Sequence, residues 1–151
     1  MTVQRLIARL KDSAGIIRFE IYSYLCSLVG MIRAKLFFNA HAFNKLEIGS
    51  GPIKKKEFIS SDINLHTDYP FDLRLGLPFP PDSIDIIYAE HVFEHFDYKT
   101  LVNLLRDCYH VLKPGGVLSA AVPDAEIYLK AYADGHDFNY KEYCKYDFGL
   151  S

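Results

Sequence analysis

Apolar residues recur at three- and four-residue steps through residues 2–38, which is the spacing of one face of an α-helix. The repeat comprises Leu6, Leu10, Ile17, Ile21, Leu25, Leu28, Ile32 and Leu36. It is interrupted at Ser13-Ala14-Gly15, where the glycine predicts a break between two helices. We therefore expect an N-terminal helical extension over residues 1–40 and a separate domain over residues 41–151.

A second rhythm begins at residue 45, where short apolar strands alternate with longer connections. Strands are predicted over Lys45–Gly49, Glu57–Asp62, Ser83–Ala89 and Val117–Val122, with a short extra strand near Asp72. This alternation predicts an α/β fold with a mainly parallel sheet that helices cover on both faces.

Helices are predicted on two segments of this domain. One runs from about Tyr98 to Leu112, begins at the capping residue Asp97 and ends at Lys113-Pro114-Gly115-Gly116. Its buried face is expected to carry Leu101, Leu104, Leu105, Cys108 and Leu112. The other is predicted over Ala125–Ala133.

Charge divides the chain in the same place as the apolar pattern. Residues 1–38 carry six Lys/Arg and two Asp/Glu, whereas the remainder is acidic, and the net charge is −2. No overall positive field attracts nucleic acid, so we expect no nucleic-acid partner. The three cysteines form no Cys-x-x-Cys pair, which is typical of a protein of the reducing cytoplasm.

The basic, apolar N-terminal segment has two interpretations. It either packs on the core or on a second subunit, or it lies as an interfacial helix at a membrane surface, since Arg and Lys flank its apolar face. Its longest uncharged run, Ile21 to Ile32, has twelve residues, and a membrane-spanning helix needs about 20. We therefore expect a cytoplasmic protein that does not span the membrane, with peripheral membrane contact through residues 2–38 as the alternative.

Several motifs follow one another in a fixed order from residue 46. They are Leu46-Glu47-Ile48-Gly49-Ser50-Gly51, Phe58–Asp62, Leu77-Pro78-Phe79-Pro80, Asp82-Ser83-Ile84-Asp85 and Glu90-His91-Val92-Phe93-Glu94-His95. Glycines after a strand allow a sharp turn and close approach of a ligand, and open α/β sheets bind ligands at the carboxyl ends of their strands. Asp62, which ends the second strand, offers two acceptor oxygens to a pair of ribose hydroxyls.

In this order, over residues 44–124, the motifs resemble class I S-adenosylmethionine-dependent methyltransferases, especially small ones linked to cell-envelope sugar pathways. The resemblance implies a Rossmann-like sheet, S-adenosylmethionine as the cofactor, and a small-molecule or glycan-pathway methyl acceptor. It implies that Glu47 attracts the cationic end of the cofactor and that Asp72 and Leu73 lie by the adenine. The cofactor-binding set is Glu47, Gly49, Ser50, Gly51, Asp62, Ile63, Asp72, Leu73, Glu90 and His91.

The proposed catalytic residues are His91 and His95, because a histidine titrates near neutral pH and can accept a proton from a hydroxyl acceptor. Asp85 is expected to be structural, starting its strand and holding the preceding loop. His91-x-x-Glu94-His95 also matches an inverted zinc-protease pattern. We expect no metal at these residues, because the methyltransferase interpretation explains the neighbouring residues as well.

A nicotinamide-binding site is the third alternative. The dinucleotide fingerprint needs a third glycine where this chain has Lys54, and an acid about 20 residues further on. The step from Gly49 to Asp62 is shorter and leaves little room for the helix that binds pyrophosphate.

The C-terminal part of the expected fold is incomplete. After Asp147-Phe148-Gly149 the family continues through a helix and two strands, but the sequence stops at Ser151. A short form, a truncation, or a partner or second copy that completes the sheet edge would each account for this. It leaves a second functional hypothesis open, a degenerate relative that binds or assembles without turnover.

Overall fold

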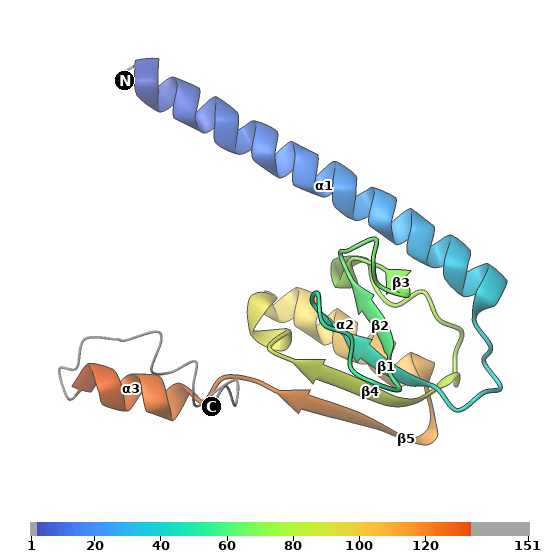
Figure 1. The fold of residues 1–151 in the computed structure, drawn as a ribbon. Coiled ribbons are helices and arrows are strands. Elements are labelled where there is room, and N and C mark those ends of the chain that lie inside the picture. The colour runs from blue at the N-terminus through green and yellow to red at the C-terminus, as the bar shows by residue number, and fades with distance from the viewer. Residues whose placement is uncertain (1–2, 134–151) are drawn as a thin grey trace.

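The computed structural model describes residues 3–133, and its first element is the long helix α1, Val3–Phe37. The C-terminal half of the helix lies against the domain, and its N-terminal half extends away from the domain (Figure 1). The predicted break at Ser13-Ala14-Gly15 is wrong, because the helix runs through it without interruption. A glycine inside a helix costs only about 1 kcal/mol relative to alanine, which is too little to stop a long helix.

Five strands form one sheet in the order β3-β2-β1-β4-β5, and all of its pairings are parallel. The strands are β1 Lys45–Ile48, β2 Ile59–Asp62, β3 Tyr69–Pro70, β4 Ile84–Glu90 and β5 Leu112–Ala121. The order reverses at β1, so the carboxyl ends of β1, β2 and β4 meet at the switch point where open α/β sheets bind ligands. The predicted parallel α/β fold is confirmed.

The connecting helices are short 3₁₀ turns, η1 Leu73–Leu75 and η2 Phe93–His95, and two α-helices, α2 Tyr98–Val111 and α3 Ala125–Ala133. Asp97 caps α2 as predicted, because its carboxylate accepts a hydrogen bond from the backbone N–H of Thr100 at 3.0 Å. The strand β5 begins at Leu112, earlier than predicted, with a register irregularity opposite Ile84 and Ile86. The residues Lys113-Pro114-Gly115-Gly116, which follow the helix, therefore belong to the strand.

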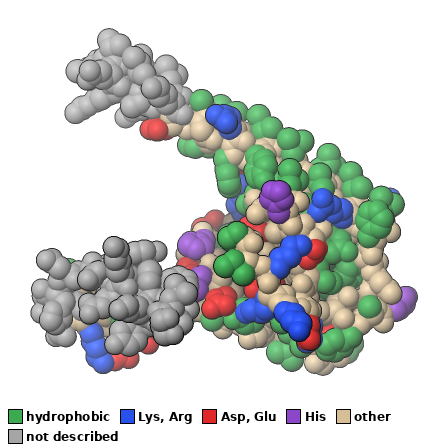
Figure 2. Space-filling model, viewed as in Figure 1, with side chains coloured by type: hydrophobic (Ala, Val, Ile, Leu, Met, Phe, Trp, Pro, Cys, Tyr) green, Lys and Arg blue, Asp and Glu red, His purple; other side chains and the backbone are tan. Residues whose placement is uncertain are grey.

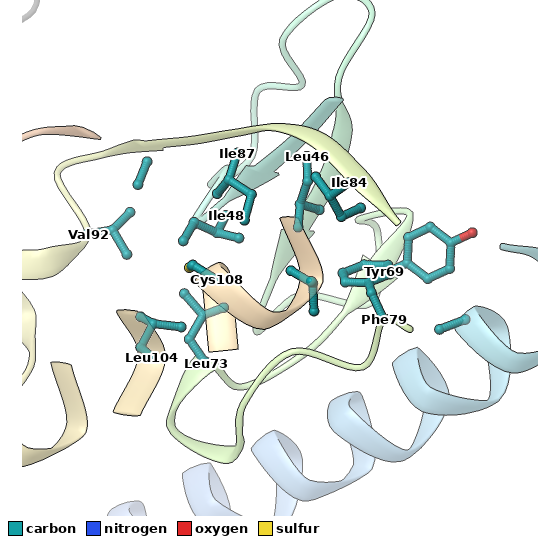
Figure 3. Close-up of a cluster of buried hydrophobic side chains, with 13 residues drawn as sticks. Leu46, Ile48, Tyr69, Leu73, Phe79, Ile84, Ile87, Val92, Leu104 and Cys108 are labelled. Atoms are coloured by element: carbon teal, nitrogen blue, oxygen red, sulfur yellow. The ribbon is translucent and has the colours of Figure 1, made fainter. Parts of the chain in front are cut away.

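The core lies between the sheet and α2 (Figure 3). The central strands contribute Leu46, Ile48, Ile84 and Ile87, all completely buried. Beneath them α2 buries Leu104, Cys108 and Val111, whereas the predicted core residue Leu105 is 38% exposed. Burial raises the pKa of the Cys108 thiol to about 12.

The other face of the sheet is less covered than predicted. Lys45, Ile86 and Tyr88 stay half-buried there, whereas the core-facing residues of the same strands are buried. In the part of the chain that the structure describes, the expected second layer of helices is therefore incomplete.

Asp85 has the structural role expected of it. Its carboxylate accepts hydrogen bonds from the Asn44 backbone N–H and from Lys113 Nζ, both at 2.7 Å. Lys113 also donates to the carbonyl oxygen of Ala42 at 2.8 Å. These contacts hold the chain before β1 and the start of β4 to the beginning of β5, and the hydrogen bond from Lys113 keeps the pKa of Asp85 below its ordinary value.

The helix α1 docks on β3 through small and polar residues. Gly30 lies so close to the strand that a Cβ there would come within 2.1 Å of the carbonyl oxygen of Pro70. Ser23 and Ser27 are buried against the segment that follows β3. Arg33 donates to the carbonyl oxygens of Thr67 and Asp68 at 2.9 and 3.2 Å.

The expectation that this helix is too short to cross a membrane is wrong on length and composition. Asp12–Phe37, 26 residues, is apolar enough for a membrane span. The sequence argument counted only the uncharged run, although a span also tolerates a few charged residues near its ends. Length and composition are the same for a helix that spans a membrane and for one that lies on its surface. The contacts that dock α1 on the domain bear on that distinction.

Candidate cofactor site

A cleft of about 450 Å³ opens at the carboxyl ends of β1, β2 and β4. Its volume is in the range of small-molecule and cofactor sites. The lining residues are Phe19, Gly49, Asp62, Ile63, Phe71, Asp72, Leu73, Arg74, His91, Val92, His95 and Phe96. The cleft therefore lies where the strand order predicts a ligand site.

The turn after β1 depends on two glycines in the left-handed region, Gly49 with φ 64° and Gly51 with φ 60°. A Cβ on Gly49 would approach Val92 Cγ2 to 2.4 Å, whereas a Cβ on Gly51 would have no atom within 4 Å. Gly49 thus allows close packing as well as the turn, and the space beside Gly51 is open to a ligand.

Asp62 is held in place by backbone donors on both of its oxygens. Gly51 N–H donates to Oδ2 at 2.7 Å and Ile63 N–H donates to Oδ1 at 2.6 Å. A carboxylate oxygen accepts about two hydrogen bonds, so each oxygen keeps a free position. A carboxylate fixed in this way, with spare acceptors in a cleft, fits a vicinal diol such as that of a ribose.

The polar part of the turn also has an unsatisfied group. The hydroxyl oxygens of Ser50 and Ser61 are buried without a hydrogen-bond partner. Buried hydroxyls without partners are rare, and one next to a predicted ligand loop is consistent with a polar ligand that binds there. The glycine turn, Asp62 and Ser50 together fit the cofactor that the sequence predicts.

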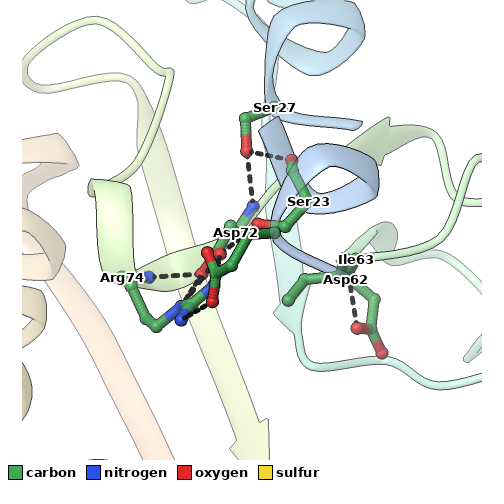
Figure 4. A network of polar contacts seen from close by, with 7 residues as sticks. Ser23, Ser27, Asp62, Ile63, Asp72 and Arg74 are labelled. Carbon is green, nitrogen blue, oxygen red and sulfur yellow. Dashed lines mark hydrogen bonds and ion pairs between the residues drawn. The ribbon is translucent and has the colours of Figure 1, made fainter. Parts of the chain in front are cut away.

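Asp72 lines the cleft but its carboxylate is already engaged (Figure 4). Arg74 donates to it through the backbone N–H at 2.9 Å and through Nε and Nη2, and Ser23 donates its hydroxyl proton. Burial raises the pKa of Asp72, but these hydrogen bonds outweigh it and hold the pKa below its ordinary value. The predicted contact with an adenine amine would therefore have to displace or share an existing donor.

Glu47 and Glu90, two of the predicted cofactor-binding residues, are not among the residues that line the cleft. They lie on either side of Lys55, whose Nζ is 3.9 Å from Glu47 Oε1 and 3.6 Å from Glu90 Oε2. The same ammonium lies 3.5 Å from the centre of the Tyr88 ring. Burial lowers the pKa of Lys55, but the contact with Tyr88 and the two carboxylates outweighs it and raises the pKa. Glu47 therefore already has a cation beside it, provided by the chain itself.

His91 and His95 both reach the cleft, from the loop after β4 and from η2. His91 has a positive φ of 54°, and its Nδ1 lies 3.3 Å from Glu94 Oε1. The segment is a short 3₁₀ turn, not the regular helix that would set His91 and His95 one turn apart for a shared metal. Among residues 3–133, no group of three or more His, Cys, Asp or Glu side chains is placed to hold a metal ion.

The structure thus brings together seven of the predicted site residues, Gly49, Asp62, Ile63, Asp72, Leu73, His91 and His95. Ser50 and Gly51 lie next to the cleft without lining it, and Gly51 acts through its hydrogen bond to Asp62. The sequence missed Phe19, Phe71, Arg74, Val92 and Phe96. Phe71 and Arg74 are neighbours of Asp72 and could have been included, whereas nothing in the sequence connects Phe19 with a loop more than forty residues away.

The loop between Gly51 and Ile59 contains no helix, so no helix N-terminus faces the glycine turn there. A dinucleotide site depends on such a terminus for its pyrophosphate. The fold and the cleft therefore define an α/β domain built for a nucleoside-type ligand without the pyrophosphate helix.

Comparison with known proteins finds similarity to methyltransferases. Residues 56–120 match the family described as "Methyltransferase domain". A curated relative, malonyl-[acyl-carrier protein] O-methyltransferase 1 of Coxiella burnetii (strain RSA 493 / Nine Mile phase I), is 36% identical over 77 residues. That alignment covers 49% of this chain and 27% of the relative, so the chain spans only about a quarter of the relative's length.

A solved structure from Methanococcus maripaludis, described as an S-adenosyl-L-methionine-dependent methyltransferase, aligns with 85% of this chain and 71% of its own. Its TM-score is 0.37 and its sequence identity 16%, so the fold assignment rests on the strand order given above. The match to the methyltransferase domain family covers less than half of the chain, so it gives a similarity to that family over residues 56–120.

Proposed function

We propose that this chain binds S-adenosylmethionine in the cleft at the carboxyl ends of β1, β2 and β4 and transfers its methyl group to a small-molecule or glycan-pathway acceptor. The observation that carries the proposal is the Asp62 carboxylate, which is fixed by Gly51 and Ile63 and keeps free acceptor positions. The methyltransferase family match supports the same reaction class.

Each part of the cleft has a role in this proposal. Asp62 would accept hydrogen bonds from the ribose hydroxyls, and Ile63, Phe71 and Leu73 would provide apolar surface for the adenine. The cofactor supplies an activated methyl group, so the protein contributes mainly placement and electrostatics. His91 and His95 would take the proton from a hydroxyl acceptor, since both reach the cleft.

The resemblance to methyltransferases implies that Glu47 attracts the cationic end of the cofactor, but Lys55 already lies beside this carboxylate. With the ammonium of Lys55 beside Glu47 and Glu90, the two carboxylates are not free to attract a second cation unless the lysine moves. Lys55 is 38% exposed in its side chain and lies on a loop, so a rotation into solvent would release both acids.

Calorimetry with the full chain tests cofactor binding directly. S-adenosylmethionine and S-adenosylhomocysteine should both bind, and Asp62→Asn should weaken binding by about 100-fold, since charged hydrogen bonds contribute about 1.5–3 kcal/mol each. Asp82→Asn is the matched control, because it makes the same chemical change at an exposed loop position outside the cleft. No binding by folded protein, or equal weakening in both variants, would refute the site.

Turnover needs a separate measurement, because a degenerate relative could bind the cofactor without using it. Radiolabelled S-adenosylmethionine should transfer its label to an acceptor when the chain is incubated with sugar nucleotides and small glycans. His95→Ala should then lower transfer while leaving calorimetric binding of S-adenosylhomocysteine nearly unchanged, whereas His91→Ala, at a residue that is also in the predicted cofactor-binding set, should lower both. Cofactor binding without transfer to any of these acceptors would favour the binding or assembly role instead.

A further inference from the structure

The side of α1 that faces away from the domain is almost entirely apolar. Six large side chains repeat along it at three- or four-residue steps and are each between 50% and 66% exposed. They are Ile17, Ile21, Leu25, Leu28, Ile32 and Leu36, hereafter the outer face of α1. Figure 2 shows apolar side chains gathered along the visible part of this helix. Isolated exposed apolar residues are ordinary, but a contiguous patch of this size marks an interaction surface.

The polarity of α1 is inverted relative to a helix that covers a core. The side that docks on the domain carries Ser23, Ser27, Gly30 and Ala34, all buried, and none of them is a large apolar residue. Large apolar residues normally face the protein and polar ones face water. The sequence of α1 therefore fits a helix with protein on one side and an apolar medium on the other.

The charged side chains near the two ends of the outer face of α1 are basic. Arg18 and Lys35 are exposed near the two ends of the outer face. The one carboxylate between them, Glu20, is paired with Arg74 of the domain at 2.9 Å. Residues 1–38 carry a formal charge of +4, from six basic and two acidic residues, whereas the rest of the chain carries −6. An anionic surface would attract this end of the molecule and repel the other.

We propose that the outer face of α1 binds the surface of an anionic lipid bilayer, with the helix lying in the plane of the interface. A bilayer is favoured over a second copy of the chain because the apolar surface is wider than the narrow seam that pairs two helices. Tyr24 and Met31, which flank the outer face, are 60% and 47% exposed. The basic ends complement anionic headgroups, and basic residues beside an apolar face are typical of interfacial helices.

The docking contacts decide between lying on the membrane and spanning it. Ser23 donates to the Asp72 carboxylate, and Ser27 accepts a hydrogen bond from the Asp72 N–H at 3.0 Å. These contacts fall in the middle of the apolar stretch, so a spanning helix would have to break them and leave Asp72 and Arg74 without those partners. From Ile17 to Leu36 the helix is about 30 Å long and could lie along the interface while it stays docked.

The position of the cleft adds a consequence that rests on the proposed function. Phe19, on α1, lines the cofactor cleft. The cleft therefore opens beside the helix that would contact lipid, and the methyl acceptor would be taken from the membrane surface.

Vesicle flotation of the full chain tests the membrane proposal without cofactor. The chain should float with vesicles of phosphatidylcholine and phosphatidylglycerol in equal amounts and much less with phosphatidylcholine alone. The triple variant Ile21→Ser, Leu25→Ser, Leu28→Ser should partition at least about tenfold less strongly. The control variant Tyr98→Ser, Tyr109→Ser, Tyr132→Ser removes three side chains that are 84–88% exposed outside α1 and should float like the natural sequence.

Folding and oligomeric state are measured on the same samples. Circular dichroism should show the same helix content in both triple variants, because the altered side chains contact solvent in the free protein. Recovery of the natural chain only in the soluble fraction would overturn the proposal. Equal flotation of the two triple variants would also overturn the proposal. So would a dimer of the natural chain in sedimentation, if the α1 variant abolishes that dimer and vesicles bind neither the natural chain nor the α1 variant. Calorimetric binding of S-adenosylhomocysteine is independent of these outcomes, so failure of the membrane proposal and failure of the cofactor site can be told apart.

Discussion

The two glycines of the turn after β1 differ in what surrounds them, and alanine at each separates two physical effects. Both have a positive φ near 60°, where an alanine costs about 1–2 kcal/mol. At Gly49 the added methyl also meets Val92 Cγ2 at 2.4 Å, whereas at Gly51 it enters open space. Overpacking in a buried site costs about 1–3 kcal/mol more. Gly49→Ala should therefore destabilise the protein by about 2–5 kcal/mol, and Gly51→Ala by about 1–2 kcal/mol.

Urea unfolding followed by circular dichroism measures both losses by linear extrapolation. The identity of the clashing partner is tested by adding Val92→Ala, which by itself removes two buried methyl groups at about 0.8 kcal/mol each. If Val92 causes the clash, Gly49→Ala combined with Val92→Ala should lose about 1–3 kcal/mol less than the sum of the two single variants. Gly51→Ala combined with Val92→Ala should be additive. Equal losses for the two glycines, or additivity in both pairs, would refute the packing argument.

Three further predictions concern the docking of α1 and the core. Ser27→Ala leaves the buried N–H of Asp72 without its acceptor and should lower the free energy of unfolding by about 1–3 kcal/mol in urea; no measurable loss would contradict the docking described above. The pKa of Asp72 is below its ordinary value of 3.8, so its ionised form stabilises the fold above about that pH, and this stability is lost as the pH falls further. Acid unfolding of the natural chain should therefore show a loss that Asp72→Asn lacks, and identical acid profiles would be the contrary result. In a Cys144→Ser background, Cys108 should resist alkylation at about pH 8 until urea unfolds the protein, because burial raises the pKa of its thiol; rapid labelling of the folded protein would contradict this.

The strands could be predicted closely because the buried strands of a parallel sheet have a simple sequence pattern. A strand buried on one face by α2 needs apolar residues such as Ile84 and Ile87, and turn residues mark its ends. Positions that depend on local backbone, such as Gly49 and Asp62, were predicted for the same reason: their roles follow from the turn next to them. The end of the helix before β5 was predicted, but the register irregularity of β5 depends on pairing with β4 and has no local signal.

Contacts between distant segments account for what the sequence did not predict. Phe19 reaches the cleft only because α1 docks on β3, and that docking depends on Gly30 fitting against Pro70. A small residue on a helix gives no sign of the surface that it will meet. Nothing in the sequence predicts that Lys55 lies between Glu47 and Glu90, because only the fold brings these three residues together.

Asp72 connects the cofactor cleft with the helix that would meet the membrane. Its carboxylate lines the cleft, and the same group accepts the hydroxyl of Ser23 and the guanidinium of Arg74, which in turn pairs with Glu20 of α1. A cofactor that hydrogen-bonds to Asp72 would compete with those donors, and a ligand that stabilises one arrangement at a shared group must affect the other. If the adenine amine donates a hydrogen bond to this carboxylate, α1 should dock more weakly when cofactor is bound. If instead Asp72 keeps its present partners and the adenine rests on the apolar wall alone, cofactor and α1 should stabilise each other through Phe19.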